Sequence, residues 1–461
     1  MNNVFKILRN VLFFVTFLYL PWDAISKEKQ PNIILLLADD LGNSDMNFCG
    51  SDFYETPNID KLADESVYFS QAYASHPTCA PSRLAIQTGK YPAHLNCVNH
   101  SYKRMPLTEI TIAERLRKGG YKTCHIGKWH LGDVGYRPSD QGYDVTITCN
   151  SKGQPASYFY PFKKPKNSGF DVPDLEDGKD GDYLTDQLTS KAIEFVQQNK
   201  EKPFFINLCY YAVHKPIEAK ADMVEKYKNK IAKSEIHTNP EYAAMVENLD
   251  SNIGRIIDAL TKTGLSDNTV VIFYSDNGGL TDVTSNYPLR DGKGSLYEGG
   301  TRVPLLIKWP GISKGGEVCT QPVIGHDLYP TIAKMAGIEL NDKELSDIDG
   351  IDITPVVSNP SAKLERNDLH WLSYPIPVHF YEAANRNPGG SLVHEDWKLI
   401  ELMESTRQSH HYELYNLKDD PGEQQDLSSS KPEIVERLKK KMIKWQKEMD
   451  APRYNKSDYK K

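Results

Sequence analysis

The chain has 461 residues, of which 39% are hydrophobic and 25% charged, with 30 glycines and 28 prolines. This length suits two or three modest domains, or one large α/β domain with a smaller one attached. The composition excludes a collagen, a coiled coil and a wholly disordered chain. Acidic residues outnumber basic ones by 62 to 55, so the chain has no general basic surface for nucleic acid. An anionic ligand would need a local cluster of cations.

The first 26 residues have the organisation of a secretory signal peptide. Lys6 and Arg9 precede an apolar run from Val11 to Leu20, and small residues precede a cleavage site after Ser26. The run is short for a transmembrane helix, although an uncleaved anchor is the alternative. We therefore expect an exported protein, in the periplasm, the extracellular medium or the lysosome, with no membrane span after signal removal.

Apolar and helical patterns then alternate along the chain. In order, they predict a strand at 32–38, helices at 108–117 and 183–198, a strand at 203–210, a helix at 242–263, and strands at 269–274 and 303–307. The strands are continuous apolar runs, which is typical of strands buried on both faces. The sequence thus predicts an α/β fold, with a large, mostly parallel sheet flanked by helices on both faces.

The composition changes near 345–368, where Ser, Asp, Asn and Pro accumulate. Shorter strand patterns follow at 396–402 and 411–415, and a lysine-rich helix comes last. Ser430 and Glu433 predict a capping box at its start. We expect a signal peptide at 1–26, an α/β domain at 27–355, and a smaller C-terminal α+β domain at 356–461 that carries an antiparallel sheet and a terminal helix.

Two of the predicted strands end in acidic sequences. Asp39 and Asp40 follow the first strand, and Asp276 and Asn277 follow the strand at 269–274. Ligand groups gather at the carboxyl ends of strands in open α/β sheets, so the two pairs are candidates for one site. Taken singly, each is as well explained as a turn.

Cys79 begins a stretch in which Pro81 indicates a helix capped near Thr78 or Cys79. The start of a helix favours an anion. A cysteine there is either a reactive thiolate or a buried structural thiol, and the local pattern leaves both open. The chain has seven cysteines; an odd number in an exported protein leaves one unpaired or chemically active.

Lys128 and His130 lie in a second stretch, Gly120 to Gly132. On an extended segment, residues two apart point the same way. A cation and an imidazole on one side suit anion binding and proton transfer, although an ordinary surface strand is the simpler explanation of the pair alone.

These two stretches resemble the two sequence motifs of the type I sulfatases, in the alkaline-phosphatase superfamily. The first fits the pattern Cys (or Ser)-x-Pro-Ser-Arg-x-x-x-Leu-Thr-Gly except that Gln87 stands where Leu is usual, which we expect to alter packing rather than chemistry. The second fits at every fixed position. The resemblance extends from Pro31 to about Glu423.

The resemblance implies a sulfuric-ester hydrolase whose motif cysteine, Cys79, is converted to formylglycine by a formylglycine-generating enzyme. One hydroxyl of the hydrated aldehyde would attack sulfur and displace the alcohol. The other would lose its proton as the bond to sulfate breaks and the aldehyde returns. The residues given catalytic roles are Cys79, Arg83, Lys128, His130, His214 and Lys293.

A divalent metal is also implied, held by Asp39, Asp40, Asp276, Asn277 and the modified Cys79. These oxygen ligands select a hard cation. The family indicates calcium (Ca²⁺), with Mg²⁺ as the alternative. Lys128 and Lys293 would hold the sulfate, and His214 would meet the ester oxygen.

Export favours a sulfated saccharide as substrate. A phosphate mono- or diester hydrolase of the same superfamily and a non-catalytic glycan-binding relative are the competing interpretations. An aromatic segment (Trp371, Tyr374, His379, Phe380 and Tyr381) is explained by core packing, with a sugar-facing wall as the alternative.

Overall fold

The computed structural model describes residues 30–99, 104–163, 171–231, 236–366, 368–374, 388–403 and 410–453. The predicted signal peptide and the aromatic residues His379, Phe380 and Tyr381 lie outside these ranges. Within them, no helix is long and apolar enough to cross a membrane.

The larger of the two parts is built on an eight-stranded sheet in the order β5-β4-β6-β1-β7-β8-β2-β9. Its strands are β1 (Asn32–Ala38), β2 (Val67–Phe69), β4 (Lys122–Gly127), β5 (Val145–Ile147), β6 (Phe204–Cys209), β7 (Thr269–Ser275), β8 (Leu305–Lys308) and β9 (Glu317–Cys319). The five from β5 to β7 are parallel, whereas β8 runs antiparallel to both β7 and β2. The sheet is therefore mostly parallel, as predicted.

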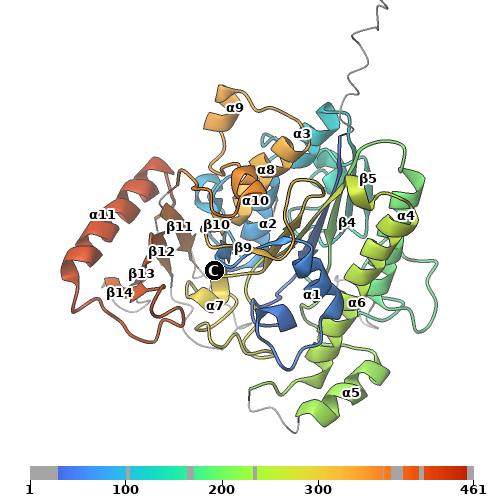
Figure 1. Cartoon of the computed structure of the whole chain (residues 1–461), viewed down its shortest axis with the longest axis horizontal. Coiled ribbons are helices and arrows are strands. Elements are labelled where there is room, and N and C mark those ends of the chain that lie inside the picture. The colour runs from blue at the N-terminus through green and yellow to red at the C-terminus, as the bar shows by residue number, and fades with distance from the viewer. Residues whose placement is uncertain are drawn as a thin grey trace, which may run out of the picture.

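Helices cover both faces of this sheet (Figure 1). The described chain as a whole contains the helices α1 (Pro57–Asp64), α2 (Cys79–Thr88), α3 (Ile112–Lys118), α4 (Leu184–Gln198), α5 (Ala221–Ile231), α6 (Pro240–Lys262), α7 (Glu298–Thr301), α8 (Leu328–Met335), α9 (Asp342–Ser346), α10 (Thr354–Ser358) and α11 (Pro432–Glu448). In β1, Ile34 and Leu36 pack into the core with α4 and α6, and Ile33 and Leu35 pack into the core with α2, α3 and α8. Burial of both faces explains the unbroken apolar run of β1.

The C-terminal part is a four-stranded antiparallel sheet with α11 packed against it (Figure 1). Its strands follow chain order: β11 (Asp368–Ser373), β12 (Gly389–His394), β13 (Trp397–Met403) and β14 (His410–Asn416). A small pair, β3 (Ala72–Tyr73) with β10 (Val323–Ile324), completes the strands of the described chain. The predicted fold class is confirmed, and the domain boundary at 355 stays a prediction.

The predicted capping box at the start of α11 is wrong. The helix begins at Pro432 with Lys431 as its N-cap, because proline is well suited to the first helical position. The hydroxyl of Ser430 instead donates to the carbonyl of Leu427. The helix predicted at 108–117 begins later, at Ile112, where Thr111 and Glu114 form a capping box.

Trp371 is 1% exposed and its indole Nε1 donates to the carbonyl of Ala74 at 2.7 Å. Tyr374 is also buried. These two members of the aromatic segment therefore belong to the core.

Candidate active site

The two acidic pairs meet because β1 and β7 are neighbours in the sheet, with Ala38 opposite Ser275. The backbone N–H of Asp40 donates to Asp276 Oδ1 at 3.3 Å, and the amide of Asn277 donates to Asp40 Oδ1 at 2.8 Å. All four side chains of Asp39, Asp40, Asp276 and Asn277 are at most 1% exposed. Buried carboxylates this close repel one another unless cations compensate them.

Cys79 is the first residue of α2, with Thr78 as the N-cap, as the position of Pro81 predicts. The side chain is 5% exposed, and its Sγ lies 3.4 Å from Nδ1 of His130. The cysteine therefore lies at a helix N-terminus with an imidazole beside it.

Arg83, one turn further along α2, ties this helix to the acidic residues. Its Nε donates to Asp276 Oδ2 at 2.8 Å, and its Nη1 donates to the carbonyl of Lys128 at 3.0 Å. Burial alone would lower the pKa of Arg83, but the charges of Asp276 and Asp39 outweigh it and raise the pKa. Arg83 is therefore a permanent positive charge within the site.

Lys128 and His130 follow β4 and both face the site. Lys128 Nζ donates to Asp39 Oδ2 at 2.6 Å. The expected extended geometry is wrong at His130, which has a left-handed φ of 63°; this turn directs its ring to Cys79. Burial, with the charges of Lys128 and Arg83, holds the pKa of His130 well below its ordinary value, so the ring is neutral.

Lys293 and His214 reach the same carboxylate from two further loops. Lys293 Nζ lies 2.6 Å from Asp40 Oδ1, and His214 Nε2 lies 3.6 Å from Asp40 Oδ2. The other ring nitrogen of His214 donates to the carbonyl of Lys215 at 2.8 Å, which leaves Nε2 facing the site. Burial would raise the pKa of Asp40, but Lys293 and His214 outweigh it and lower the pKa.

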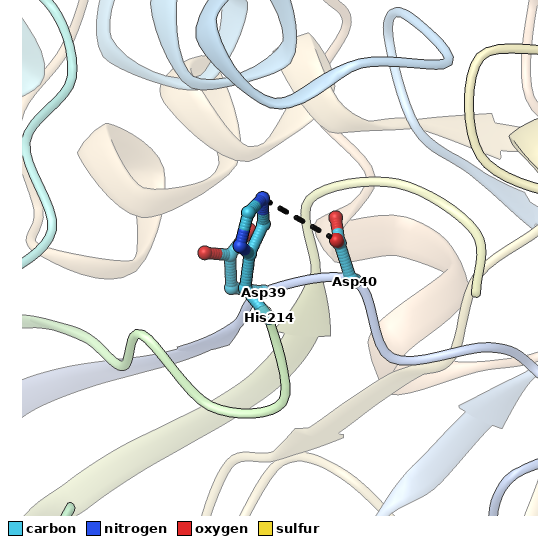
Figure 2. Close-up of side chains that lie close together, drawn as sticks. All are labelled: Asp39, Asp40 and His214. Carbon is cyan, nitrogen blue, oxygen red and sulfur yellow. Dashed lines mark ion pairs between the residues drawn. The ribbon is translucent and has the colours of Figure 1, made fainter. Parts of the chain in front are cut away.

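Asp39, Asp40 and His214 form a buried group whose ligand atoms all lie within 4.8 Å of one another (Figure 2). Asp39 Oδ1 and Asn277 Oδ1 are buried with no hydrogen-bond partner. Asp39 Oδ1 does lie 3.7 Å from Arg83 Nη2, but buried oxygens that make no hydrogen bond, next to further carboxylates, fit a hard divalent cation. Asp276 and Cys79, also predicted as ligands, are not members of this group of three.

All the predicted site residues thus lie in one connected cluster. The sequence motifs do not, however, indicate the residues that support them. Tyr158 donates its hydroxyl to the carbonyls of Tyr211 and His214, at 2.6 and 2.9 Å. Gly153 approaches the ring of His130 so closely that a Cβ there would lie 2.6 Å from Cε1. These contacts join distant segments, and no local pattern signals them.

The seven cysteines all lie in the described ranges, and none forms a disulfide. Burial raises the pKa of Cys97, Cys124, Cys149 and Cys209. These four thiols are therefore protonated and unreactive.

Family models match nearly the whole chain. The model described as Sulfatase matches residues 31–338, and the model described as N-sulphoglucosamine sulphohydrolase, C-terminal, matches residues 291–448. The chain therefore belongs to the sulfatase family, which confirms the resemblance seen in the two motifs.

Particular relatives support the same class. A sulfatase of Formosa agariphila is 31% identical, with 92% of this chain and 90% of the relative covered. Arylsulfatase J of Mus musculus is 32% identical, with 93% and 78% covered. The crystal structure of Ps i-CgsB superposes with a TM-score of 0.78 at 31% identity, covering 94% of this chain and all of that one. The protein is thus an enzyme of the sulfatase class.

Proposed function

We propose that the protein hydrolyses a sulfate ester of a glycan, with Cys79 converted to formylglycine and a divalent cation bound beside it. The observation that carries this proposal is the convergence of Arg83, Lys128 and Lys293 on buried carboxylates next to the Cys79 side chain. Such a centre combines negative ligands for a metal with cations that can bind a sulfate group.

The metal would be held by Asp39, Asp40, Asp276, Asn277 and the modified side chain at position 79, and we propose Ca²⁺ with Mg²⁺ as the alternative. When bound, it would polarise a sulfate oxygen and acidify a neighbouring hydroxyl. The Oδ1 atoms of Asp39 and Asn277, which are buried and make no hydrogen bond, support this assignment.

The hydrated formylglycine would supply the nucleophilic hydroxyl. Lys128 and Lys293 hold the sulfate, and Arg83 orients the side chain at position 79. His130 accepts a proton from that side chain, since its Nδ1 lies 3.4 Å from the sulfur of Cys79. His214 meets the ester oxygen with Lys293 beside it, because both approach the same carboxylate of Asp40.

A glycan substrate is supported by the predicted export signal and by one relative. Ps i-CgsB, at 31% identity, has been solved in complex with k-i-k-neocarrahexaose. We therefore propose a sulfated saccharide as substrate, an extracytoplasmic location, and maturation by a formylglycine-generating enzyme.

The proposal is tested by co-expressing the chain with a formylglycine-generating enzyme. Mass spectrometry of the peptide around position 79 measures conversion, and assays compare 4-nitrophenyl sulfate with 4-nitrophenyl phosphate. We expect preferential sulfate release, abolished in Cys79→Ala, because an alanine side chain cannot be oxidised to the aldehyde that forms the geminal diol. Chelation by EDTA should remove activity, and added Ca²⁺ or Mg²⁺ should restore it. No turnover by the converted, metal-loaded protein would contradict the proposal.

A further inference from the structure

A short segment after β5, residues 150–158, contacts both histidines of the proposed mechanism. It leads from β5 towards α4, and the proposed function gives none of its residues a role. One end of the segment contacts His130 through Asn150 and Gly153. The other end contacts the turn that carries His214 through Tyr158. The segment therefore links the two imidazoles from outside the catalytic cluster.

Asn150 fixes the first end of the segment beside His130. Its carbonyl accepts the backbone N–H of His130 at 3.2 Å. Its side-chain oxygen accepts the backbone N–H of Lys152 at 2.8 Å, and its side-chain nitrogen donates to the carbonyl of Asp171 at 3.0 Å. An asparagine that bonds the backbone two residues ahead stabilises a tight turn. This turn brings the next residue but one after Ser151, Gly153, onto the ring of His130.

Gly153 lies directly against the imidazole of His130. A Cβ on Gly153 would lie 2.6 Å from Cε1 and 2.9 Å from Nε2 of that ring. Gly153 is not among the glycines with positive φ, so the contact with the ring, and not the backbone conformation, excludes a side chain here. On its other side, Nδ1 of the ring lies 3.4 Å from Cys79 Sγ. Residue 153 therefore determines how the imidazole is presented to position 79.

Tyr158 holds the turn that carries His214. Its side chain is fully buried, and its hydroxyl donates to the carbonyls of Tyr211 and His214, at 2.6 and 2.9 Å. One hydroxyl thus joins the two ends of the turn. Tyr158 is itself anchored by Glu218, whose carboxylate accepts the backbone N–H of Tyr158 at 2.8 Å and the hydroxyl of Ser157 at 2.7 Å.

We propose that residues 150–158 are a positioning segment for both histidines, in which Gly153 positions His130 and Tyr158 positions His214. The inference rests on the proposed function and adds the residues through which its two imidazoles are held. Small displacements of such groups cost much of the rate, because catalysis depends on their geometry.

The two histidines belong to different steps of the proposed function, so the two positioning residues have different kinetic effects. In the first step a diol hydroxyl bonds to sulfur, the S–O bond to the alcohol breaks, and the alcohol leaves with a proton; His214 faces its oxygen. In the second step the remaining hydroxyl gives its proton to His130. The carbon–oxygen bond to sulfate then breaks, and the aldehyde returns as sulfate leaves.

Gly153→Ala tests the second step on the formylglycine-containing protein. With 4-nitrophenyl sulfate, kcat should fall about 10²-fold while KM does not rise, because the affected step follows binding. Mass spectrometry of quenched reactions should then detect sulfate bound to the peptide around position 79. Gly119→Ala is the matched control, since a Cβ at the end of α3 would meet the side chain of Ile338 instead. It should leave kcat unchanged.

Tyr158→Phe tests the first step, because it removes one hydroxyl and keeps the ring. The kcat/KM for phenyl sulfate should fall about tenfold, and that for 4-nitrophenyl sulfate much less, because the more basic leaving group depends more on the groups that face its oxygen. Tyr121→Phe is the matched control. Its buried hydroxyl donates to the carbonyl of Pro31 at 2.8 Å, at the amino ends of β4 and β1, so both substrates should be unaffected.

NMR of ¹⁵N-labelled histidine in the unconverted protein tests the positioning without turnover. Gly153→Ala should shift the imidazole signals of His130 and leave those of His214, and Tyr158→Phe should do the reverse. His130→Gln and His214→Gln assign the signals. If Gly153→Ala does not fold, Asn150→Ala replaces it, because it removes the side-chain bonds of the turn without a clash and should have the same effects on His130.

Two results would overturn the positioning segment. One is an unshifted signal of the histidine concerned in either variant. The other is a shifted signal with wild-type kinetics, or with losses equal to those of the matched controls. Failure of the converted, metal-loaded wild type to hydrolyse any sulfate ester would instead contradict the proposed function, and the NMR comparison would still decide whether the segment positions the two rings.

Discussion

Lys128 is a fully buried cation whose Nζ lies 2.6 Å from Asp39 Oδ2. Lys128→Met keeps the length of the side chain but removes the charge that would bind sulfate. We expect kcat/KM on 4-nitrophenyl sulfate to fall by about 10²–10³-fold, which is common for a single preorganised electrostatic group. Steady-state kinetics on the formylglycine-containing variant measure this loss.

Lys90→Met is the control for Lys128→Met, because it also removes a buried positive charge. Lys90 is 7% exposed and pairs with Glu109 and Asp347, at 2.8 and 3.0 Å, away from the catalytic cluster. Lys90→Met should lower the free energy of unfolding without changing kcat/KM at temperatures below the melting temperature. Equal losses in the two variants would mean that Lys128 acts through folding alone.

Gln87, which departs from the family pattern, is part of a buried polar chain. Its Oε1 accepts a hydrogen bond from Tyr143 at 2.8 Å, and the Tyr143 hydroxyl accepts one from Asn207 at 3.2 Å. Gln87→Leu restores the family residue but leaves the Tyr143 hydroxyl without an acceptor. We expect the free energy of unfolding to fall by about 1–2 kcal/mol, with activity unchanged, in urea titrations.

The double variant Gln87→Leu with Tyr143→Phe provides the check. Removing both partners leaves no unpaired hydroxyl, and Asn207 keeps its contact with His125. Stability should therefore return close to that of the wild type. A double variant less stable than the single one would show that the hydrogen bond is not the cause.

At the scale of elements, the sequence predicts strands and helices most reliably where one physical effect dominates. The continuous apolar run of Asn32–Ala38 coincides with β1, because both faces of that strand are buried. The run at 303–307 overlaps a strand, β8. Its antiparallel direction is determined by the connection from β7 and not by the residues of β8 itself. The capping box at Ser430 fails because Pro432 fixes the helix start.

Asp250 on α6 links that helix to the start of α1. Its carboxylate accepts hydrogen bonds from the backbone N–H groups of Asn58 and Ile59, at 2.9 and 2.8 Å. Burial raises its pKa from 3.8 to about 6, although these hydrogen bonds oppose the shift. The folded state therefore binds this proton more tightly than the unfolded state, so the stabilisation is complete below about pH 4 and is lost as the pH rises through 6.

The variant Asp250→Asn cannot titrate at this position. Between pH 4 and pH 7 its free energy of unfolding should rise relative to that of the wild type, by about 2 kcal/mol for a shift of this size. Urea titrations at several pH values measure the difference. Asp258→Asn, an exposed carboxylate on the same helix, should show no such trend, and parallel curves for Asp250→Asn would contradict the argument.

At the scale of the whole molecule, the sequence indicates which residues form the site but not how they are held. The motifs identify Cys79, Lys128 and their neighbours because that chemistry requires those residue types. The left-handed turn at His130 and the pairing of Tyr158 with the loop at His214 depend on segments that meet only in the folded chain. Such contacts therefore cannot be predicted from local sequence patterns.

The C-terminal sheet contacts the segment that packs on the loop around Lys293, to which we assign a catalytic role. Lys398 on β13 is fully buried, with its Nζ 2.8 Å from Glu298 Oε1 and 2.9 Å from Glu423 Oε1. Glu298 begins α7, and the next two residues of α7 are glycines that pack on the loop around Lys293. A Cβ on Gly300 would lie 2.5 Å from the carbonyl of Gly292, so the backbone of α7 packs directly against that loop.

Lys398→Met should therefore affect both stability and catalysis. It leaves two buried carboxylates without their shared cation, so we expect a loss of about 3–5 kcal/mol in the free energy of unfolding. The activity that remains below the melting temperature should also fall, because α7 supports the Lys293 loop.

Lys441→Met is the matched control, since Lys441 pairs with Asp368 in the same sheet but is 36% exposed. That pair should contribute at most about 1 kcal/mol and leave kcat/KM unchanged; equal effects of the two variants would refute the link between the C-terminal sheet and the catalytic loop.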